Sequence, residues 1–410
     1  MSWECECLFK PAGFIEQSCL IQHGEKHNIL ADIKDPVRDE LYSASGSKSW
    51  MLHLLYRPLG TDFAMEIKLG IVGCGYGKNV VVPAFRADAR CRIVAIAANS
   101  ADSARLAATQ LGIEHAYGDW RILVEDAAVH AVVVATPPAA QPEIVLGALR
   151  SQKAVFAEKP LGAGVGDVRE MANKAAASGL ANMVDFNFTG ITAFTLARKM
   201  LHNDAIGPIR HVAVNWQTES YTNRARLENW KSSAQLGGGA LSNFVSHSLH
   251  YLEWFMGPIT GLTARLFHML HDPRPADTSV SLAMEFRSGA AGMLNMSAAA
   301  FPGSGHKIEF YGEDGSLALE NPTGDYMRGF RVSHCRRPAT EMALVKVDDP
   351  EEKRWEDGRV LPLSRLAKNF FDWIELGTPA RPDFRDGLRV QELIAAAQHS
   401  HRSGSWVKIP

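Results

Sequence analysis

The stretch IKLGIVGCGYGK, residues 67–78, is a short apolar run that ends in three glycines at alternate positions. A buried strand followed by Gly73, Gly75 and Gly77 lets the backbone approach a pyrophosphate at the start of the next helix. The third small residue of the usual G-x-G-x-x-G pattern is missing, because Lys78 occupies its place. A purely structural turn would also favour glycine. Whether this turn binds a dinucleotide therefore depends on the segments that follow it.

Apolar runs and helical patterns alternate after this turn. Strands are predicted at 67–72, 91–98, 131–136 and 154–160, and helices at 79–87, 100–112, 141–152 and 167–179. Continuous Val, Ile and Ala without polar alternation indicate parallel strands that are covered on both faces. Right-handed crossovers then give a doubly wound Rossmann domain over residues 65–187, and this context favours dinucleotide binding.

The pattern changes in residues 188–410. A helix at 194–203 precedes alternating strands, which are predicted at 209–220, 278–286, 290–300, 307–312 and 315–321. Helices near 363–376 and 386–402 end the chain and could pack back on the first domain, and the charged run 348–359 is interpreted as a solvated loop. The fold class is therefore α/β: a Rossmann domain followed by an α+β domain with an open, mostly antiparallel sheet.

Residues 1–64 differ from both domains, because they show no sustained periodicity. Met65 stands two residues before the first strand, where a start codon would stand. We interpret residues 1–64 as a poorly ordered extension, and the alternative is that the natural chain begins at Met65.

The bulk composition excludes several function classes. The chain has 410 residues, 46% of them hydrophobic, and a formal net charge of −2. The sequence has no basic cluster dense enough to indicate a nucleic-acid-binding surface. No apolar run reaches the roughly 18 residues that a membrane-spanning helix needs. The six cysteines lack zinc-like spacing, so no metal site is expected, and reduced thiols favour a cytoplasmic location.

The end of the second strand bears on the choice of cofactor. An acidic residue usually binds the ribose 2′-hydroxyl of NAD at this point, but here Asn99 and Ser100 follow the strand. The missing carboxylate removes repulsion against a 2′-phosphate, which favours NADP over NAD. Asn99 and Ser100 could equally cap the following helix.

Two further motifs carry polar side chains. In VFAEKPL, Glu158 and Lys159 end a buried strand, where such sheets bind ligands, although a lysine there is often a surface residue. In GGGALSNFVSHSLHYLEW, residues 237–254, three glycines precede a helix on which Asn243, His247 and His250 are spaced by four and three. This spacing predicts one shared face.

Together these motifs resemble the glucose–fructose oxidoreductase / inositol dehydrogenase / MocA family. The resemblance spans Ile67–Pro410 and rests on GCGYGKNVVVPAF, VVVATPPAAQ, AEKPL, GGGALSNFVSHSLHYLEWFMG, YGEDGSLALE and FRDGLRVQELIAAAQHS in this order. It implies an NAD(P)-dependent oxidoreductase acting on a sugar, cyclitol or related polyol. It also implies a homo-oligomer that assembles through the sheet of the second domain.

The resemblance assigns Lys159 and His247 to acid/base catalysis and places the glycine segment beside the nicotinamide. Asn243 replaces a common Asp, and a neutral Asn can orient the imidazole ring of His247 but adds little stabilisation to its charged form. For His250 a structural role is favoured over a catalytic one. Gln141 takes the place of a frequent His as a cofactor-side contact. The implied cofactor contacts are Gly73, Gly75, Tyr76, Gly77, Asn99, Ser100, Thr136, Pro137, Gln141, Glu158, Lys159 and Asn187.

We therefore expect hydride transfer between a nicotinamide and a substrate hydroxyl. Two alternatives stay open: a catalytically impaired NAD(P)-binding regulatory protein, and an NAD-dependent glycoside-cleaving enzyme. The polar loop 219–233 could contact the substrate or simply be solvated, and its candidate residues are Tyr221, Arg224, Arg226, Trp230 and Lys231. Its basic residues would suit a carboxylated or phosphorylated sugar.

Overall fold

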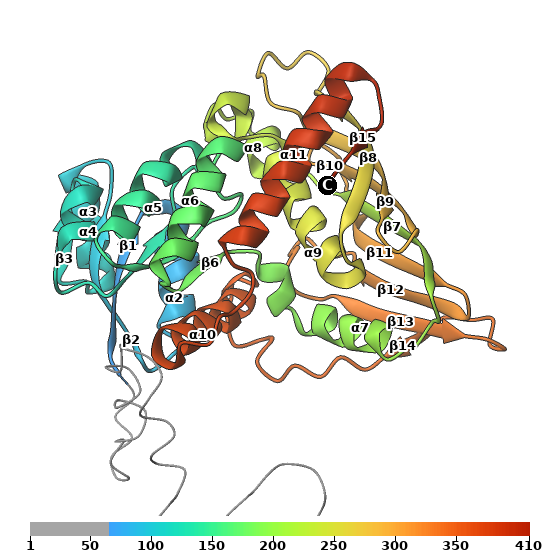
Figure 1. Cartoon of the computed structure of the whole chain (residues 1–410), viewed down its shortest axis with the longest axis horizontal. Coiled ribbons are helices and arrows are strands. Elements are labelled where there is room, and N and C mark those ends of the chain that lie inside the picture. The colour runs from blue at the N-terminus through green and yellow to red at the C-terminus, as the bar shows by residue number, and fades with distance from the viewer. Residues whose placement is uncertain (1–64) are drawn as a thin grey trace, which may run out of the picture. The chain divides into compact units, whose positions relative to one another are not determined.

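The computed structural model describes residues 65–410, so the predicted extension, residues 1–64, lies outside the described part of the chain. Within the described residues, the strands form one six-stranded and one nine-stranded sheet (Figure 1). None of the helices there is long and apolar enough to cross a membrane.

The first sheet has the strand order of a dinucleotide-binding fold. Its strands are β1 (Ile67–Val72), β2 (Cys91–Ala97), β3 (His115–Tyr117), β4 (Ala131–Val134), β5 (Ala154–Ala157) and β6 (Asn182–Val184). They are arranged β3-β2-β1-β4-β5-β6 and every pair is parallel, so the predicted Rossmann domain is confirmed. The sequence missed β3 and β6, because three residues are too few to show a periodicity.

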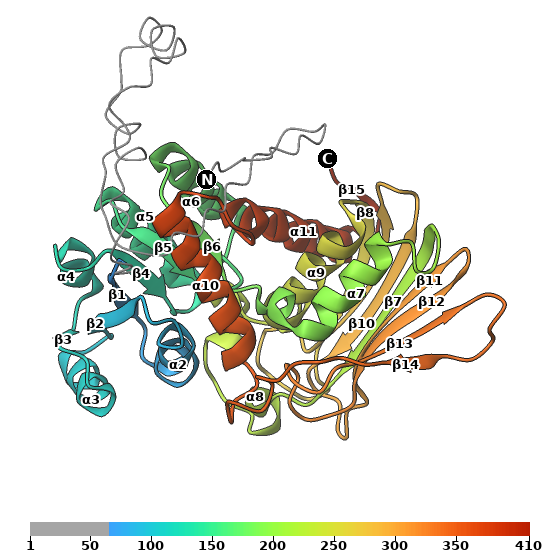
Figure 2. The same ribbon diagram turned by 90° about the horizontal axis from the view of Figure 1, so that it is seen from below.

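Helices cover both faces of this sheet. They are η3 (Gly77–Val81), α2 (Val82–Phe85), α3 (Ala101–Leu111), α4 (Trp120–Glu125), α5 (Gln141–Arg150) and α6 (Val165–Ser178). Side chains of β1 that point to one face pack with α2 and α3, and the opposite face packs with α4, α5 and α6. Helix α10 (Val360–Leu376), near the end of the chain, lies with α2 (Figure 2), where the Phe371 ring meets Phe85 at 5.6 Å.

The second sheet is mostly antiparallel, as predicted. Its strands are β7 (Ile209–Gln217), β8 (Ile259–Phe267), β9 (Ser279–Phe286), β10 (Ala291–Ser297), β11 (Gly305–Gly312), β12 (Gly315–Asn321), β13 (Arg331–Arg336), β14 (Ala343–Val345) and β15 (Val407–Lys408). The order is β14-β13-β12-β11-β7-β10-β9-β8-β15, and among these pairs β7 and β10 run parallel. Successive side chains of a strand point to opposite faces, so strands such as β10 have one buried and one open side.

Three helices pack on one face of this sheet: α7 (Thr192–His202), α9 (Ser246–Met256) and α11 (Phe384–Ser403) (Figures 1 and 2). On the other face alternate side chains are exposed, as in β10, where Met293 and Asn295 are exposed while Leu294 and Met296 are buried. Helix α11 also packs on α6, so it links the second sheet to the first domain.

Candidate active site

A cavity of about 800 Å³ opens where the carboxyl ends of the parallel strands meet the second domain. Its wall from the first domain includes Gly73, Cys74, Gly75, Tyr76, Asn99, Thr136, Pro137, Glu158, Lys159 and Asn187. Its wall from the second domain includes Trp216, Tyr221, Trp230, Lys231, Asn243, His247, Tyr326 and Arg359. Since β1 and β4 lie side by side, the loops after them meet at the switch point of the sheet, where such folds bind ligands.

The three glycines of the turn have two different roles: Gly73 and Gly75 line the cavity, and Gly77 permits close packing. Gly73 has a φ of 113°, and a Cβ there would collide with the carbonyl oxygen of Ala135. Gly75 faces open space, whereas a Cβ on Gly77 would lie 3.1 Å from the Ile71 side chain. Gly77 is buried and is not part of the cavity wall; it permits close packing of η3 on β1, which is the task of the missing third small residue.

The segment after β2 fits both interpretations that the sequence left open. Asn99 lies on the cavity wall beside Ala98 and Ser103. The Ser100 side chain accepts a hydrogen bond from the Ser103 amide at 3.2 Å and caps α3, and Ser100 itself is not among the lining residues. Of the described residues that follow β2, Ala98, Asn99 and Ser103 line the cavity, and none of these three carries a carboxylate.

Gln141 lies behind the cavity wall, although the resemblance implied a cofactor-side contact. Its side-chain amide donates to the carbonyl oxygens of Thr136 at 3.3 Å and Glu158 at 3.0 Å. Its side-chain oxygen accepts from the Gly162 amide at 2.9 Å. This fully buried side chain therefore ties together the backbone that follows β4 and β5.

The Lys159 amine lies in the cavity against Asn243. Its Nζ donates to the backbone oxygen of Asn243 at 2.8 Å and to Oδ1 at 3.2 Å. Burial lowers the pKa of Lys159 to about 8; the Glu158 carboxyl opposes this shift, and the Lys231 charge adds to it. The amine can therefore gain and lose a proton close to neutral pH.

His247 lines the same cavity as Lys159. Its side chain is buried, its ring lies 4.8 Å from that of Phe188, and its Nδ1 has no hydrogen-bond partner among the described residues. Burial, then the charge of Lys159, hold the pKa of His247 well below its usual range. The imidazole is neutral and can orient a hydroxyl group, but it cannot supply a positive charge.

His250 does not share the face of Asn243 and His247, contrary to the spacing argument. Residues Leu241–Val245 form a π-helical turn before α9, which changes the helical period, and three residues along α9 leave a side chain about 60° away. The His250 ring stacks on Phe186 at 4.3 Å and faces a different cavity.

A buried pair of carboxyl groups stands beside the lysine. The Tyr76 hydroxyl donates to Asp185 Oδ2 at 3.0 Å, and Asp185 is hydrogen-bonded to Glu158. Burial and the neighbouring Asp185 raise the pKa of Glu158 well above its usual range. The sequence analysis did not identify Asp185, although it lies two residues before Asn187.

The far part of the chain contributes residues that sequence reasoning missed. Tyr326 lines the cavity, and the Arg359 guanidinium lies 5.5 Å from the centre of the Tyr76 ring. The segment 348–359 is thus more than a solvated loop, since its last residue reaches the cavity. In the loop 219–233, Tyr221, Trp230 and Lys231 line the wall, whereas Arg224 and Arg226 do not.

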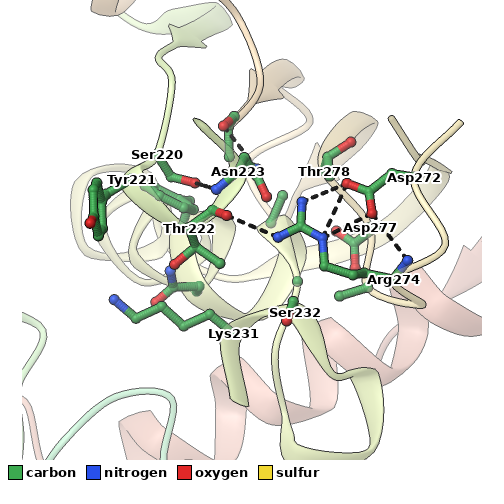
Figure 3. Close-up of a pocket in the computed structure, with 16 residues that line it drawn as sticks. Ser220, Tyr221, Thr222, Asn223, Lys231, Ser232, Asp272, Arg274, Asp277 and Thr278 are labelled. Carbon is green, nitrogen blue, oxygen red and sulfur yellow. Dashed lines mark hydrogen bonds and ion pairs between the residues drawn. The ribbon is translucent and has the colours of Figure 1, made fainter. Parts of the chain in front are cut away.

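A side pocket of about 130 Å³ adjoins the cavity behind Asn243 and Lys231 (Figure 3). Arg274 closes it, pairing with Asp272 at 2.5 Å and donating to the Thr222 carbonyl oxygen at 2.9 Å. Figure 3 shows this guanidinium between the two partners.

The side pocket also explains the glycines before α9. Asp277 Oδ2 accepts a hydrogen bond from the Leu241 amide at 2.8 Å, which holds the start of the π-helical turn. Gly239 has a φ of 102°, and a Cβ there would collide with the Asp277 carboxylate. Residues 237–239 are absent from the wall of the large cavity. They permit close packing instead: Gly237 against Pro138, Gly238 against the backbone of Trp230, and Gly239 against Asp277.

The cavity fits a dinucleotide. Four of its residues carry a buried polar atom that has no partner in the described part of the chain: Thr136 Oγ1, Asn187 Oδ1, Trp216 Nε1 and His247 Nδ1. Buried polar atoms are normally hydrogen-bonded, so this concentration indicates groups that await a ligand. Among residues 65–410, no cluster of His, Cys, Asp or Glu is arranged to hold a metal ion.

Comparison with known proteins gives the family. The family model described as "Oxidoreductase family, NAD-binding Rossmann fold" matches residues 67–186. The family model described as "Oxidoreductase family, C-terminal alpha/beta domain" matches residues 198–409. An uncharacterized oxidoreductase of Synechocystis sp. is 27% identical over 84% of this chain and 96% of its own length. A levoglucosan dehydrogenase of Pseudarthrobacter phenanthrenivorans is 23% identical over 77% of this chain and 89% of its own.

A solved structure agrees with these matches. The crystal structure of an NAD binding oxidoreductase from Klebsiella pneumoniae is similar with a TM-score of 0.74 at 25% identity, covering 84% of this chain and 99% of that one. The chain therefore belongs to the glucose–fructose oxidoreductase / inositol dehydrogenase / MocA family and is an NAD-binding oxidoreductase.

Proposed function

We propose that this chain transfers a hydride between a nicotinamide dinucleotide and a CH–OH carbon of a sugar, cyclitol or related polyol. One observation carries the proposal: the Lys159 amine, with a pKa of about 8, lines the same cavity as His247 and the glycine turn. A general base works best when its pKa lies near the operating pH.

In this proposal Lys159 takes the proton of the substrate hydroxyl, and the two oxygens of Asn243 hold the amine in place. The neutral His247 hydrogen-bonds the same substrate oxygen through a ring nitrogen. The nicotinamide, when bound, accepts the hydride. Because Asn243 carries no charge, it leaves the pKa of Lys159 lower than a carboxylate at this position would, and Lys159 rather than His247 carries the proton.

The cofactor would be held by wall residues of the first domain. Gly73 and Gly75 leave the backbone open to a pyrophosphate, and Thr136 and Asn187 each offer an unpartnered side-chain atom. For the ribose, Asn99 supports the preference for NADP, since no carboxylate beside it would repel a 2′-phosphate. The glycine turn itself serves NAD and NADP alike.

The substrate class follows from the relatives and from the charges on the wall. Levoglucosan dehydrogenase, named above, acts on a sugar derivative, which supports a carbohydrate-like substrate here. Lys231 and Arg359 add positive charge to the second-domain wall, so sugar acids belong among the candidates. The open face of the second sheet, with Met293 exposed, supports assembly into a homo-oligomer.

The test is turnover by the purified full-length chain. We would offer both NAD and NADP with sugars, sugar acids, cyclitols and amino sugars, and follow the absorbance of the reduced nicotinamide. With the best substrate, Lys159→Ala should lower turnover at least about a hundredfold, the scale of a lost acid/base group. Lys174→Ala, at an exposed lysine of α6, is the matched control and should leave turnover unchanged.

Three outcomes would change the proposal. Unaltered turnover in Lys159→Ala would remove the role of the lysine. Tight cofactor binding without turnover of any compound would favour a regulatory protein, an outcome with which Asn243 in place of Asp agrees. Sugar release without net reduction of the cofactor would indicate glycoside cleavage through transient oxidation.

A further inference from the structure

A second cavity of about 880 Å³ lies away from the proposed active site, among α7, α9, α10 and α11. Of these four helices, α9 and α11 lie side by side (Figures 1 and 2). Phe186 separates the two histidines of α9: the His250 ring stacks on it at 4.3 Å, and the His247 ring meets it edge-on at 6.3 Å. The wall of this second cavity includes His250 and none of the residues assigned to the cofactor.

The wall of this cavity carries more basic than acidic side chains. Its charged residues are the cations Arg198, Arg365, Lys368, Arg381 and Arg389 and the anions Glu253 and Asp386. Four of the cations have carboxylate partners, for example Arg389 with Glu253 at 3.0 Å. Arg198 pairs with no carboxylate of the described residues, so the wall holds one positive charge that the protein does not neutralise.

Two side chains of this wall, Arg198 and His250, each have a buried nitrogen without a hydrogen-bond partner in residues 65–410. These atoms are Arg198 Nε and His250 Nδ1. His250 is only 8% exposed, so its ring is more than nine-tenths buried. Burial, followed by the charge of Arg381, lowers the pKa of His250 to about 3. A neutral imidazole and a cation without a carboxylate partner therefore line the same cavity.

An aromatic surface completes the wall. The Arg198 guanidinium lies 4.3 Å from the centre of the Trp254 ring. Trp254 and His250 are four residues apart on α9, so their rings are neighbours on one face. Arg198, Trp254, His250 and Arg381 therefore line one cavity, in which the unpaired charge of Arg198 lies against an aromatic ring.

We propose that this second cavity binds a small organic anion that bears phosphate or carboxylate groups. The anionic groups would be held by Arg198 and Arg381 with a hydrogen bond from His250, and the carbon skeleton would lie against Trp254. The volume falls in the range of about 300–1,000 Å³ that ligand cavities occupy, so an organic skeleton rather than a bare ion fills it. Arg198 has no carboxylate partner among the described residues, so an anion in the cavity would supply the opposite charge that the protein does not.

The test uses two probes, citrate and 2,3-bisphosphoglycerate, which represent the carboxylate and the phosphate chemistry. Neither has a free secondary or primary CH–OH group, so the proposed dehydrogenase activity cannot consume them. Each is titrated calorimetrically into the full chain, with and without saturating NADH. We expect at least one probe to bind with a Kd below about 1 mM, and NADH to change that Kd less than about threefold, because the cofactor occupies the other cavity.

Variants locate the binding. Arg198→Gln together with Arg381→Gln should weaken the probe at least about tenfold, which corresponds to about 1.4 kcal/mol. Lys199→Gln, at an exposed lysine adjacent to Arg198 on α7 and outside the cavity, is the matched control and should not weaken it. If the double variant does not fold, Arg198→Gln alone decides, since it breaks no ion pair.

Three results would overturn the proposal: no binding of either probe at about 10 mM, equal binding by wild type and the arginine variants, or loss of binding when NADH is present. The measurement does not depend on catalysis. The anion site can therefore fail while the proposed dehydrogenase function stands, and the reverse also holds.

Discussion

Replacing Asn243 by Asp tests whether the charge state of Lys159 is determined by its neighbours. The Lys159 amine lies 2.8 Å from the backbone oxygen and 3.2 Å from Oδ1 of Asn243. In Asn243→Asp the atom at Oδ1 becomes part of a carboxylate. The new charge favours the ammonium form, so the pKa of Lys159 should rise from about 8.

The size of the rise follows from Coulomb's law. Two unit charges at 3.2 Å interact by about 1.3 kcal/mol in water and by about 5 kcal/mol at an effective dielectric constant of about 20. Since one pKa unit corresponds to about 1.4 kcal/mol, the pKa should rise by about one unit at the least. At pH 8 the neutral fraction of the amine then falls from about a half to about a tenth or less, and turnover in the oxidative direction falls at least about fivefold.

The assay measures the lysine directly. Competitive labelling of amines, read by mass spectrometry from about pH 6 to about pH 11, gives the pKa of Lys159 without any substrate. The pH dependence of turnover gives a second value once a substrate is known: oxidation should increase as pH rises through the pKa, because the neutral amine is the base. In Asn243→Asp both midpoints should move to higher pH together.

Asn243→Ser is the matched control. It keeps the backbone oxygen that accepts the shorter hydrogen bond and adds no charge, so its midpoint should stay within about half a unit of wild type. If Asn243→Asp and wild type labelled with the same midpoint, Lys159 would not lie against residue 243, and the assigned proton transfer would be wrong.

Two further predictions concern the backbone around the site. Gly73→Ala forces a Cβ onto the Ala135 carbonyl at a positive φ, so it should lower stability by about 1–3 kcal/mol and reduce the Tm; Gly75→Ala meets nothing within 4 Å and should leave the Tm unchanged. Asp277→Ala leaves the Leu241 amide without its partner, and urea unfolding should show a loss of about 1–3 kcal/mol, whereas Asp277→Asn keeps an acceptor and should lose less. Equal Tm values for the two glycine variants, or equal unfolding midpoints for the two Asp277 variants, would contradict these assignments.

The parts of the fold that the sequence predicted are those with a local signal. Continuous apolar runs located β1, β2, β4 and β5, and glycines located the ends of α3 and α6. The carboxyl ends of parallel strands share one edge, so the topology alone brings Gly73 and Lys159 to one cavity. The three-residue strands β3 and β6 gave no such signal, because tertiary pairing and not local preference makes them strands.

The parts of the site that the sequence missed depend on tertiary contacts. Tyr326 and Arg359 come from segments far along the chain, and only the folded second domain brings them to Tyr76. Gln141 illustrates the opposite error: the motif position suggested a cofactor contact, but the side chain is fully buried and bonds to the backbone of both neighbouring loops. Helical spacing likewise grouped His250 with His247, but the Phe186 ring contacts both and the two histidines line different cavities.

The chemistry of Lys159 therefore belongs to the packing of the two domains and not to the lysine alone. Lys159 lies two residues after β5 of the first domain. Asn243, which bonds to it, and Lys231 and Arg359, which lower its pKa, come from the second domain. Helix α10 helps to fix this arrangement: its residues pack on the first sheet, and Arg90 of the first domain pairs with Glu375 at 2.9 Å. Arg359 directly precedes α10, so a change in the packing of α10 on the first domain would move Arg359. Because the charge of Arg359 lowers the pKa of Lys159, that movement would change the pKa of the lysine.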